Sequence, residues 1–259
     1  MNQPLHAGLP LLGDCIGMAI RGQGDPLAIK RIEREAQRLL DKRAARADLS
    51  WLILAFTAFL QGKASECVRC IDAAAKLAPF DLGVVGNAGS ILAGVGEPRR
   101  ALEFGRLQAG ISAGDDKQLS FSCLVLRKAL YFEEAVEAMR TYRGADVELY
   151  RDSAQRLVDL AVARDLSPEL RLSLLETAIE AVRSQGCSIR QTGLRQYSDD
   201  ALRYIFFIDE SATKCGSVNF AIAEALTEKF EDTHAEFVTF ACRPLSSYDV
   251  SGSFIEVAR

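Results

Sequence analysis

The residue types best suited to chemistry are concentrated between residues 209 and 217. This stretch supplies two acids, three hydroxyl groups, one lysine and one thiol. It follows a strongly β-favouring run and precedes an amphipathic helical pattern, and open α/β sheets bind ligands at such strand-to-helix junctions. The free amides at a helix N-terminus also attract anions. We therefore expect a small anionic ligand to be held by Asp209, Glu210, Thr213, Lys214, Cys215 and Ser217.

Known catalytic motifs are incomplete in this stretch. A haloacid-dehalogenase-like phosphatase would have a second Asp in place of Ser211, and a tyrosine-phosphatase-like loop would have Arg in place of Ala221. A P-loop would have several glycines before Lys214. The alternative interpretation is ordinary helix capping beside a solvated pair of acids. We assign no catalytic residue and expect a non-enzymatic protein, and an enzyme built on this stretch ranks last among the alternatives.

Cysteine and histidine do not form a recognisable metal or catalytic set. Cys67 and Cys70 make one C-x-x-C pair in the middle of a helical pattern, and a zinc site would need two more ligands. The two histidines, His6 and His234, are far apart in the sequence. The odd number of cysteines, seven, fits buried free thiols in a reducing compartment, with the cytoplasm as the expected location. We expect no metal and no cofactor.

A small α/β module, residues 200–259, should position the 209–217 stretch. Residues 202–208 form a continuous apolar run typical of a buried strand, residues 217–230 have helical periodicity, and residues 235–242 predict a second strand. A third strand is expected at 254–258, which gives the order β-α-β-β. Residues 186–200 contain Gly, Ser, Thr and Asp and are expected to form a linker or surface loop. So small a module should pack on the rest of the chain or pair with a second copy in a homodimer.

A helical repeat precedes this module. Two small side chains, twelve residues apart, recur at a spacing of thirty-four residues. Small residues at such positions let two helices of a hairpin approach closely, and a fixed period predicts stacked helical units. The six positions are Ala55, Gly89 and Cys123, with Cys67, Ala101 and Ala135. Gly62 and Gly96 fall where each hairpin turns.

The first unit carries a more extensive pattern: Trp51, Leu54, Ala55, Gly62, Cys67, Ile71, Ala74, Leu77 and Pro79. This pattern resembles the tetratricopeptide-repeat family over residues 48–142, and later units match it less well. The resemblance implies a mainly α fold in which antiparallel hairpins stack as a short α-solenoid, followed by the small α/β module. It also implies three parts: an N-terminal arm and capping helix (1–47), a repeat domain (48–185) and the module (200–259).

The helical pattern of residues 49–60 is apolar on almost every side, so this helix should be buried on more than one face. In the family that it resembles, first helices line a concave groove, which would place Ile53 and Phe56 there with Asn87 and Ser90 of the next unit. The alternative is that the N-terminal helix or the C-terminal module covers Ile53 and Phe56 within the same chain.

Composition narrows the functional classes. The 259 residues have a net charge of -4 and a pI of about 5.4, which gives no global basic field for nucleic acid. The sequence contains no run of eighteen apolar residues, so no membrane span is predicted. No cleaved signal peptide is expected either. We expect an adaptor, chaperone or assembly factor that binds an apolar segment of another protein in the groove. The alternative function is a regulatory protein that binds a small anion at residues 209–217.

Overall fold

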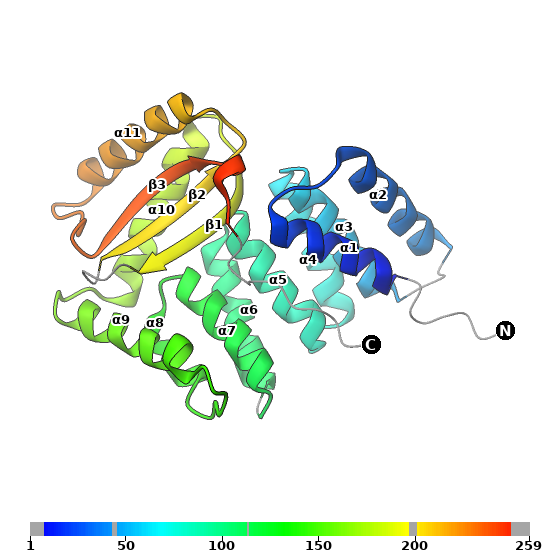
Figure 1. Ribbon diagram of the computed structural model, residues 1–259, viewed down its shortest axis with the longest axis horizontal. Coiled ribbons are helices and arrows are strands. Elements are labelled where there is room, and N and C mark those ends of the chain that lie inside the picture. The colour runs from blue at the N-terminus through cyan, green and yellow to red at the C-terminus, as the bar shows by residue number, and fades with distance from the viewer. Residues whose placement is uncertain (1–7, 43–45, 113, 197–200, 250–259) are drawn as a thin grey trace.

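The computed structural model describes residues 8–42, 46–112, 114–196 and 201–249. The chain is mainly helical, with a small three-stranded mixed sheet near its C-terminus. The molecule is elongated: helices α1 to α4 lie at one end, and the sheet with α11 lies at the other (Figure 1). Within the described residues, no helix combines the length and apolarity that a bilayer crossing requires.

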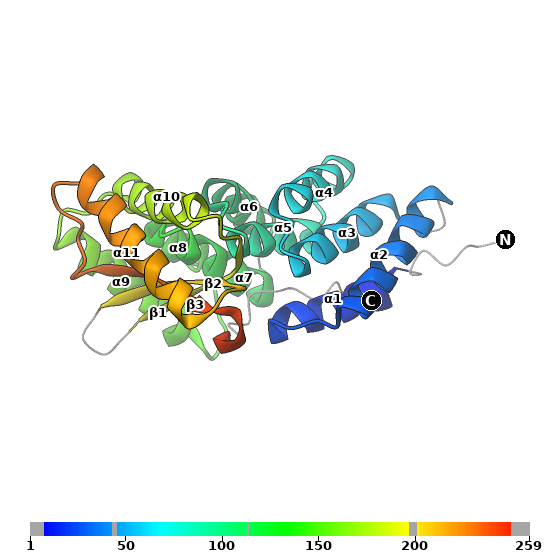
Figure 2. The same cartoon turned by 90° about the horizontal axis from the view of Figure 1, so that it is seen from above.

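Two helices form the N-terminal end: α1 (Leu9–Arg21) and α2 (Pro26–Asp41). The sequence predicts an irregular arm or a short helix in this region, whereas α1 is a helix of 13 residues. Both pack against the first helix of the repeat, α3, and Figure 2 shows them alongside it. The side chain of Asp25 caps α2 by accepting hydrogen bonds from Leu27 N and Ala28 N.

The repeat region consists of helix pairs that pack in chain order. Their bounds are α3 (Ala47–Leu60), α4 (Ala64–Leu77), α5 (Leu82–Gly94), α6 (Pro98–Ile111), α7 (Asp116–Lys128) and α8 (Phe132–Ala138). All six small residues of the repeat are buried, as close helix crossings require. The turns of the first two pairs contain Gly62 and Gly96, with φ of 71° and 76°. Leu130 occupies the third turn at φ 61°, a conformation that glycine adopts at lower cost.

The next two helices are α9 (Ser153–Val162), which follows a π-helical turn at Glu148–Asp152, and α10 (Pro168–Ser184). The sequence predicts that they form a further hairpin on the repeat. Instead, α9 packs against α8, whereas α10 packs mainly against α11 and also contacts α6 and β3. The prediction fails because the apolar side chains of α10 share one core with the sheet.

The sheet contains β1 (Ile189–Gln196), β2 (Leu202–Ile208) and β3 (Val238–Pro244), in that order. β1 is antiparallel to β2, and β2 is parallel to β3 through the crossover helix α11 (Ala212–Lys229). The predicted linker at 186–200 is therefore wrong, because it contains β1. The described order is β-β-α-β rather than β-α-β-β. The expected third strand at 254–258 lies outside the described residues.

β1 joins the sheet to the helices. Arg190 Nη2 donates a hydrogen bond to Leu60 O, and Thr192 Oγ1 donates one to Ala93 O at 3.0 Å. These carbonyls lie at the C-terminal ends of α3 and α5, where a helix leaves acceptors without intrahelical partners. β1 also packs against α7. Alternate residues of β1 thus donate hydrogen bonds to the ends of α3 and α5, the first helices of two successive pairs, and this fixes the sheet against the repeat region.

Candidate functional site

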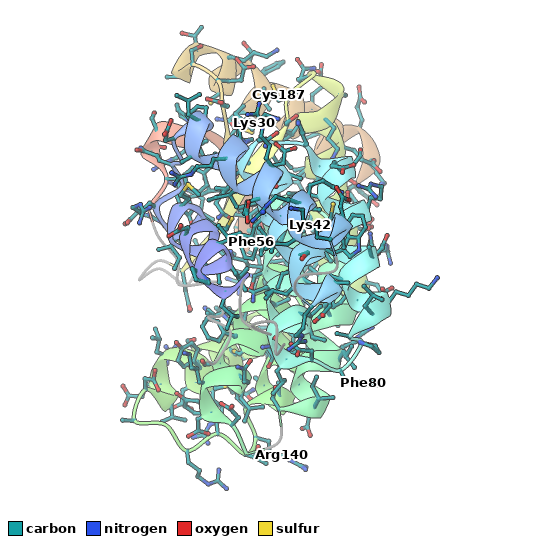
Figure 3. All side chains as sticks on the ribbon, turned by 90° about the vertical axis from the view of Figure 1, so that its right-hand side faces the viewer. Lys30, Lys42, Phe56, Phe80, Arg140 and Cys187 are labelled. Carbon is teal, nitrogen blue, oxygen red and sulfur yellow. The ribbon has the colours of Figure 1, made fainter. Side chains whose placement is uncertain are left out.

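The four residues predicted to line a groove are core residues in this structure. Ile53, Phe56 and Asn87 have no exposed surface, and Ser90 is 1% exposed. Helix α1 packs on α3 and contributes Leu12, Cys15, Ile16 and Ala19 to the core that contains Ile53 and Phe56. Phe56 lies inward of α1 and α2 in Figure 3. Of the two interpretations, cover by the same chain describes this structure.

The six residues predicted to bind an anion lie after β2 and in the first turns of α11. Thr213, Lys214, Cys215 and Ser217 lie in the first turns of α11 rather than in a loop. Ser211 is the N-cap of this helix, and its side chain accepts a hydrogen bond from Lys214 N at 3.2 Å. Glu210, Thr213 and Ser217 are exposed, whereas Cys215 is buried. The structure therefore shows the helix cap that was the alternative interpretation. Among the six residues, Asp209 alone lines the cleft described below.

The described thiols are unsuited to nucleophilic chemistry. Burial raises the pKa of Cys215, and the neighbouring Cys187 and Glu210 raise it further. Burial likewise raises the pKa of Cys70 to about 12 and that of Cys67 above its usual range. All seven cysteines are buried and free. The C-x-x-C pair is therefore part of the packing of α4, as the sequence predicted.

A cleft of about 560 Å³ lies between the N-terminal helices and the sheet. We call it the junction cleft. Its apolar side chains come from both sides of this junction: Ala19, Pro26, Ile29, Phe59, Leu60 and Leu245. Its charged side chains are three basic residues and one acid: Lys30, Lys63, Arg190 and Asp209. Its volume is typical of a site that takes a small ligand or a short segment of chain.

Arg190 connects the two sides of the junction cleft. It begins on β1, reaches the end of α3 at Leu60 O, and pairs with Asp209 Oδ2 through Nη1 at 3.0 Å. Its Nε atom is buried and has no hydrogen-bond acceptor among the described residues. Gly62 makes this route available, because a Cβ atom at that position would lie 2.8 Å from Arg190 Cδ.

Gln191 follows Arg190 and is 1% exposed. Its Oε1 atom accepts a hydrogen bond from Thr192 N at 3.2 Å, but its Nε2 atom has no acceptor among the described residues. The two buried groups of the junction cleft that lack partners are therefore both donors. An unsatisfied buried donor costs about 1–3 kcal/mol of stability.

Arg190 and Gln191 could not be predicted from the sequence because β1 lacks a regular alternation of apolar residues. A register shift between Ile189 and Gln191 places Gln191 and Thr192, two neighbours, in buried positions. Such a β-bulge interrupts the two-residue period by which strands are recognised. The signal that remains is the pair Ile189 and Leu194, which is too sparse to distinguish a strand from a loop.

One group of side chains in the described part of the chain has the spacing of cation ligands. Asp232, His234 and Glu236 place their donor atoms within 4.8 Å of one another. Both carboxylates are exposed, and exposed acids beside a histidine are common on protein surfaces. We assign no metal to this group.

Comparison with models of protein families, with curated proteins and with solved structures gives no match for this chain. The class that can be stated is therefore structural. The chain is a mainly helical protein whose small mixed sheet is attached to its helices through β1.

Proposed function

We propose that this protein is a non-enzymatic interaction module, an adaptor, chaperone or assembly factor, that binds an apolar segment of another protein in the junction cleft. The observation that carries the proposal is the cleft itself, which is open and has apolar side chains on both walls. The proposed binding surface moves from Ile53 and Phe56 to the half-buried Leu60 at the end of the same helix. The resemblance to tetratricopeptide repeats, with its short α-solenoid, stays a prediction that favours a protein partner.

The chemistry of the junction cleft favours binding over catalysis. Its charged groups are an arginine held by two hydrogen bonds, an exposed aspartate and two lysines. No thiol, histidine or hydroxyl group lines it, so a nucleophile activated by a neighbouring base is missing from its described lining. Apolar walls with a few polar groups are typical of sites that recognise a chain segment or a small ligand.

Homodimerisation through the C-terminal module also stays a prediction. β3 is an edge strand of the described sheet, and an edge strand can pair with a second copy of itself. Light scattering on the purified protein would test this prediction independently of the junction cleft. A monomer at every concentration would exclude it and leave the proposed binding site unaffected.

Site-specific photocrosslinking tests the proposed function. A photoreactive amino acid at position 63 lies in the junction cleft, and the same residue at position 42 lies at the far end of α2. We expect crosslinks from position 63 to map to apolar segments of a partner protein and to disappear when Leu245→Asp is added. Position 42 should give no such crosslink. If position 63 captures no protein, and small anions raise the melting temperature instead, the small-ligand alternative replaces the proposed function.

A further inference from the structure

We infer that the junction cleft selects an acidic segment, a stretch of a partner protein in which carboxylate side chains lie beside apolar ones. This inference rests on the proposed function and adds the chemistry of the partner. It follows from three properties of the lining: its charge, the nature of its unsatisfied groups and the position of its apolar walls.

The charge of the junction cleft is opposite in sign to that of the whole chain. Three basic side chains and one acid line the cleft, whereas the chain has a net charge of -4. Lys30 is paired with Glu33 at 2.8 Å. Lys63 is exposed and forms no salt bridge with any acid that the structure describes. Because Lys30 and Arg190 are each paired with an acid, Lys63 supplies the positive charge of the described lining that has no salt-bridge partner. Complementary charge steers a partner and fixes its orientation.

The unsatisfied groups of the cleft are all donors. Arg190 uses one hydrogen bond for Leu60 O and one for Asp209, which leaves its buried Nε atom without an acceptor. Gln191 Nε2 lacks an acceptor as well, and the Lys63 ammonium group can only donate. The Arg190 Nε and Gln191 Nε2 atoms are buried, so the donor that a bound segment can reach is the exposed Lys63 ammonium group, which calls for a carboxylate.

The apolar walls explain why a carboxylate alone is an incomplete ligand. Phe59 and Leu60 lie beside the basic groups on the α3 side, and Leu245 lies on the sheet side. A segment that alternates acidic and apolar side chains would meet both kinds of surface. A free inorganic anion would leave the half-buried Leu60 and Leu245 exposed to water, so the lining favours a segment over an ion.

The test measures binding of synthetic nonapeptides to the full chain. Each peptide carries leucine or phenylalanine at alternate positions, with Glu, Gln or Lys at the positions between. Fluorescence anisotropy measures the affinity of each peptide for the protein. We expect Glu peptides to bind at least tenfold more tightly than their Gln counterparts at low salt, with Lys peptides weakest. The Glu-to-Gln ratio should fall at high salt, because ions screen exposed charges.

Charge reversal at the cleft provides the matched comparison. Lys63→Glu should lower the Glu-to-Gln ratio at least fivefold. Lys42→Glu is the control, since Lys42 is exposed and lies ~18 Å along α2 from Lys30 at the rise of an α-helix. Figure 3 shows the two lysines separated along this helix. Lys42→Glu should leave the ratio unchanged.

The outcomes separate the inference from the function on which it rests. If Glu and Gln peptides bind equally, the acidic preference is wrong and the interaction module stands. If Lys42→Glu acts as strongly as Lys63→Glu, long-range charge rather than the cleft causes the preference, and the inference is again wrong. If no peptide binds, while phosphate or a dicarboxylate raises the melting temperature of wild type but not of Lys63→Glu, both the inference and the proposed function are overturned.

Discussion

The middle and the C-terminal end of helix α3 have different surroundings, although both are apolar. Its middle, with Ile53 and Phe56, is fully buried in a core to which α1 contributes. Its C-terminal end, with Phe59 and Leu60, lines the junction cleft beside β1. An apolar helix face indicates that something covers it, but the cover can be the same chain. For α3, a segment some forty residues earlier covers the middle, and a strand more than a hundred residues later approaches the end.

The largest expected effect on stability is at the buried middle of α3. Phe56→Ala removes a fully buried aromatic side chain and leaves a cavity, so we expect the free energy of unfolding to fall by about 3–5 kcal/mol. Denaturant unfolding followed by circular dichroism measures this loss. Phe80→Ala is the control, since its side chain is 70% exposed and its loss should be small. Equal effects of the two substitutions would mean that Phe56 faces water.

The second prediction concerns Lys128 at the end of α7, another helix that contacts β1. Burial lowers the pKa of Lys128 to about 8. Between about pH 8 and the usual lysine pKa of about 10.4, Lys128 therefore binds more protons in the unfolded chain than in the folded chain. Below that window, the buried charge of Lys128 destabilises the folded state. Lys128→Met should stabilise the protein at pH 7 by up to about 3 kcal/mol.

The advantage of Lys128→Met over wild type should shrink as pH rises through 8, where wild-type Lys128 loses its proton. Unfolding of both proteins at pH 7, 8 and 9 measures this difference, and comparing them cancels the opposite contribution of the buried thiols. A pH-independent difference would show that Lys128 titrates normally and that the end of α7 is open to water.

The third prediction tests the route of Arg190 through the junction. Gly62→Ala places a Cβ atom against Arg190 and forces alanine into a left-handed conformation, which costs about 1–2 kcal/mol. Gly186→Ala imposes the same backbone strain, but no atom lies within 4 Å of the new Cβ. We expect Gly62→Ala to destabilise the protein more than Gly186→Ala in thermal unfolding. Equal effects would contradict the close packing of Arg190 at the end of α3.

The smallest expected effect is at the start of α11. Ser211→Ala removes a helix cap and should lower stability by about 1 kcal/mol. Because Ser211 is outside the junction cleft, peptide binding should be unchanged, as anisotropy with a Glu peptide would show. A loss of peptide binding without a loss of stability would indicate that the ligand site is at residues 209–217 and not in the junction cleft.

Local patterns in the sequence predicted the elements whose determinants are local. The repeat helices and the turns at Gly62 and Gly96 follow from periodicity and from glycine at positions of positive φ. The strand at 202–208 follows from a continuous β-favouring run. These features depend on residues within a few positions of each other, so a single sequence contains the information.

The features that escaped prediction depend on contacts between distant segments. β1 is stabilised by its ladder with β2 and by the carbonyls of Leu60 and Ala93, none of which its own residues reveal. The cover of Ile53 by α1 likewise requires knowing where a helix separated from α3 by α2 packs. The junction cleft was missed for the same reason, since only Asp209 among its residues was singled out.

Thiol labelling most directly compares the buried middle of α3 with the junction cleft. All seven native cysteines are buried, so a maleimide should react slowly with the wild type and report on one introduced cysteine at a time. We predict that Leu245→Cys, in the junction cleft, reacts rapidly and is protected by a Glu peptide, whereas Ile53→Cys reacts only as the protein unfolds. Rapid labelling at position 53, protected by the same peptide, would contradict the account and place the binding site in the buried middle of α3.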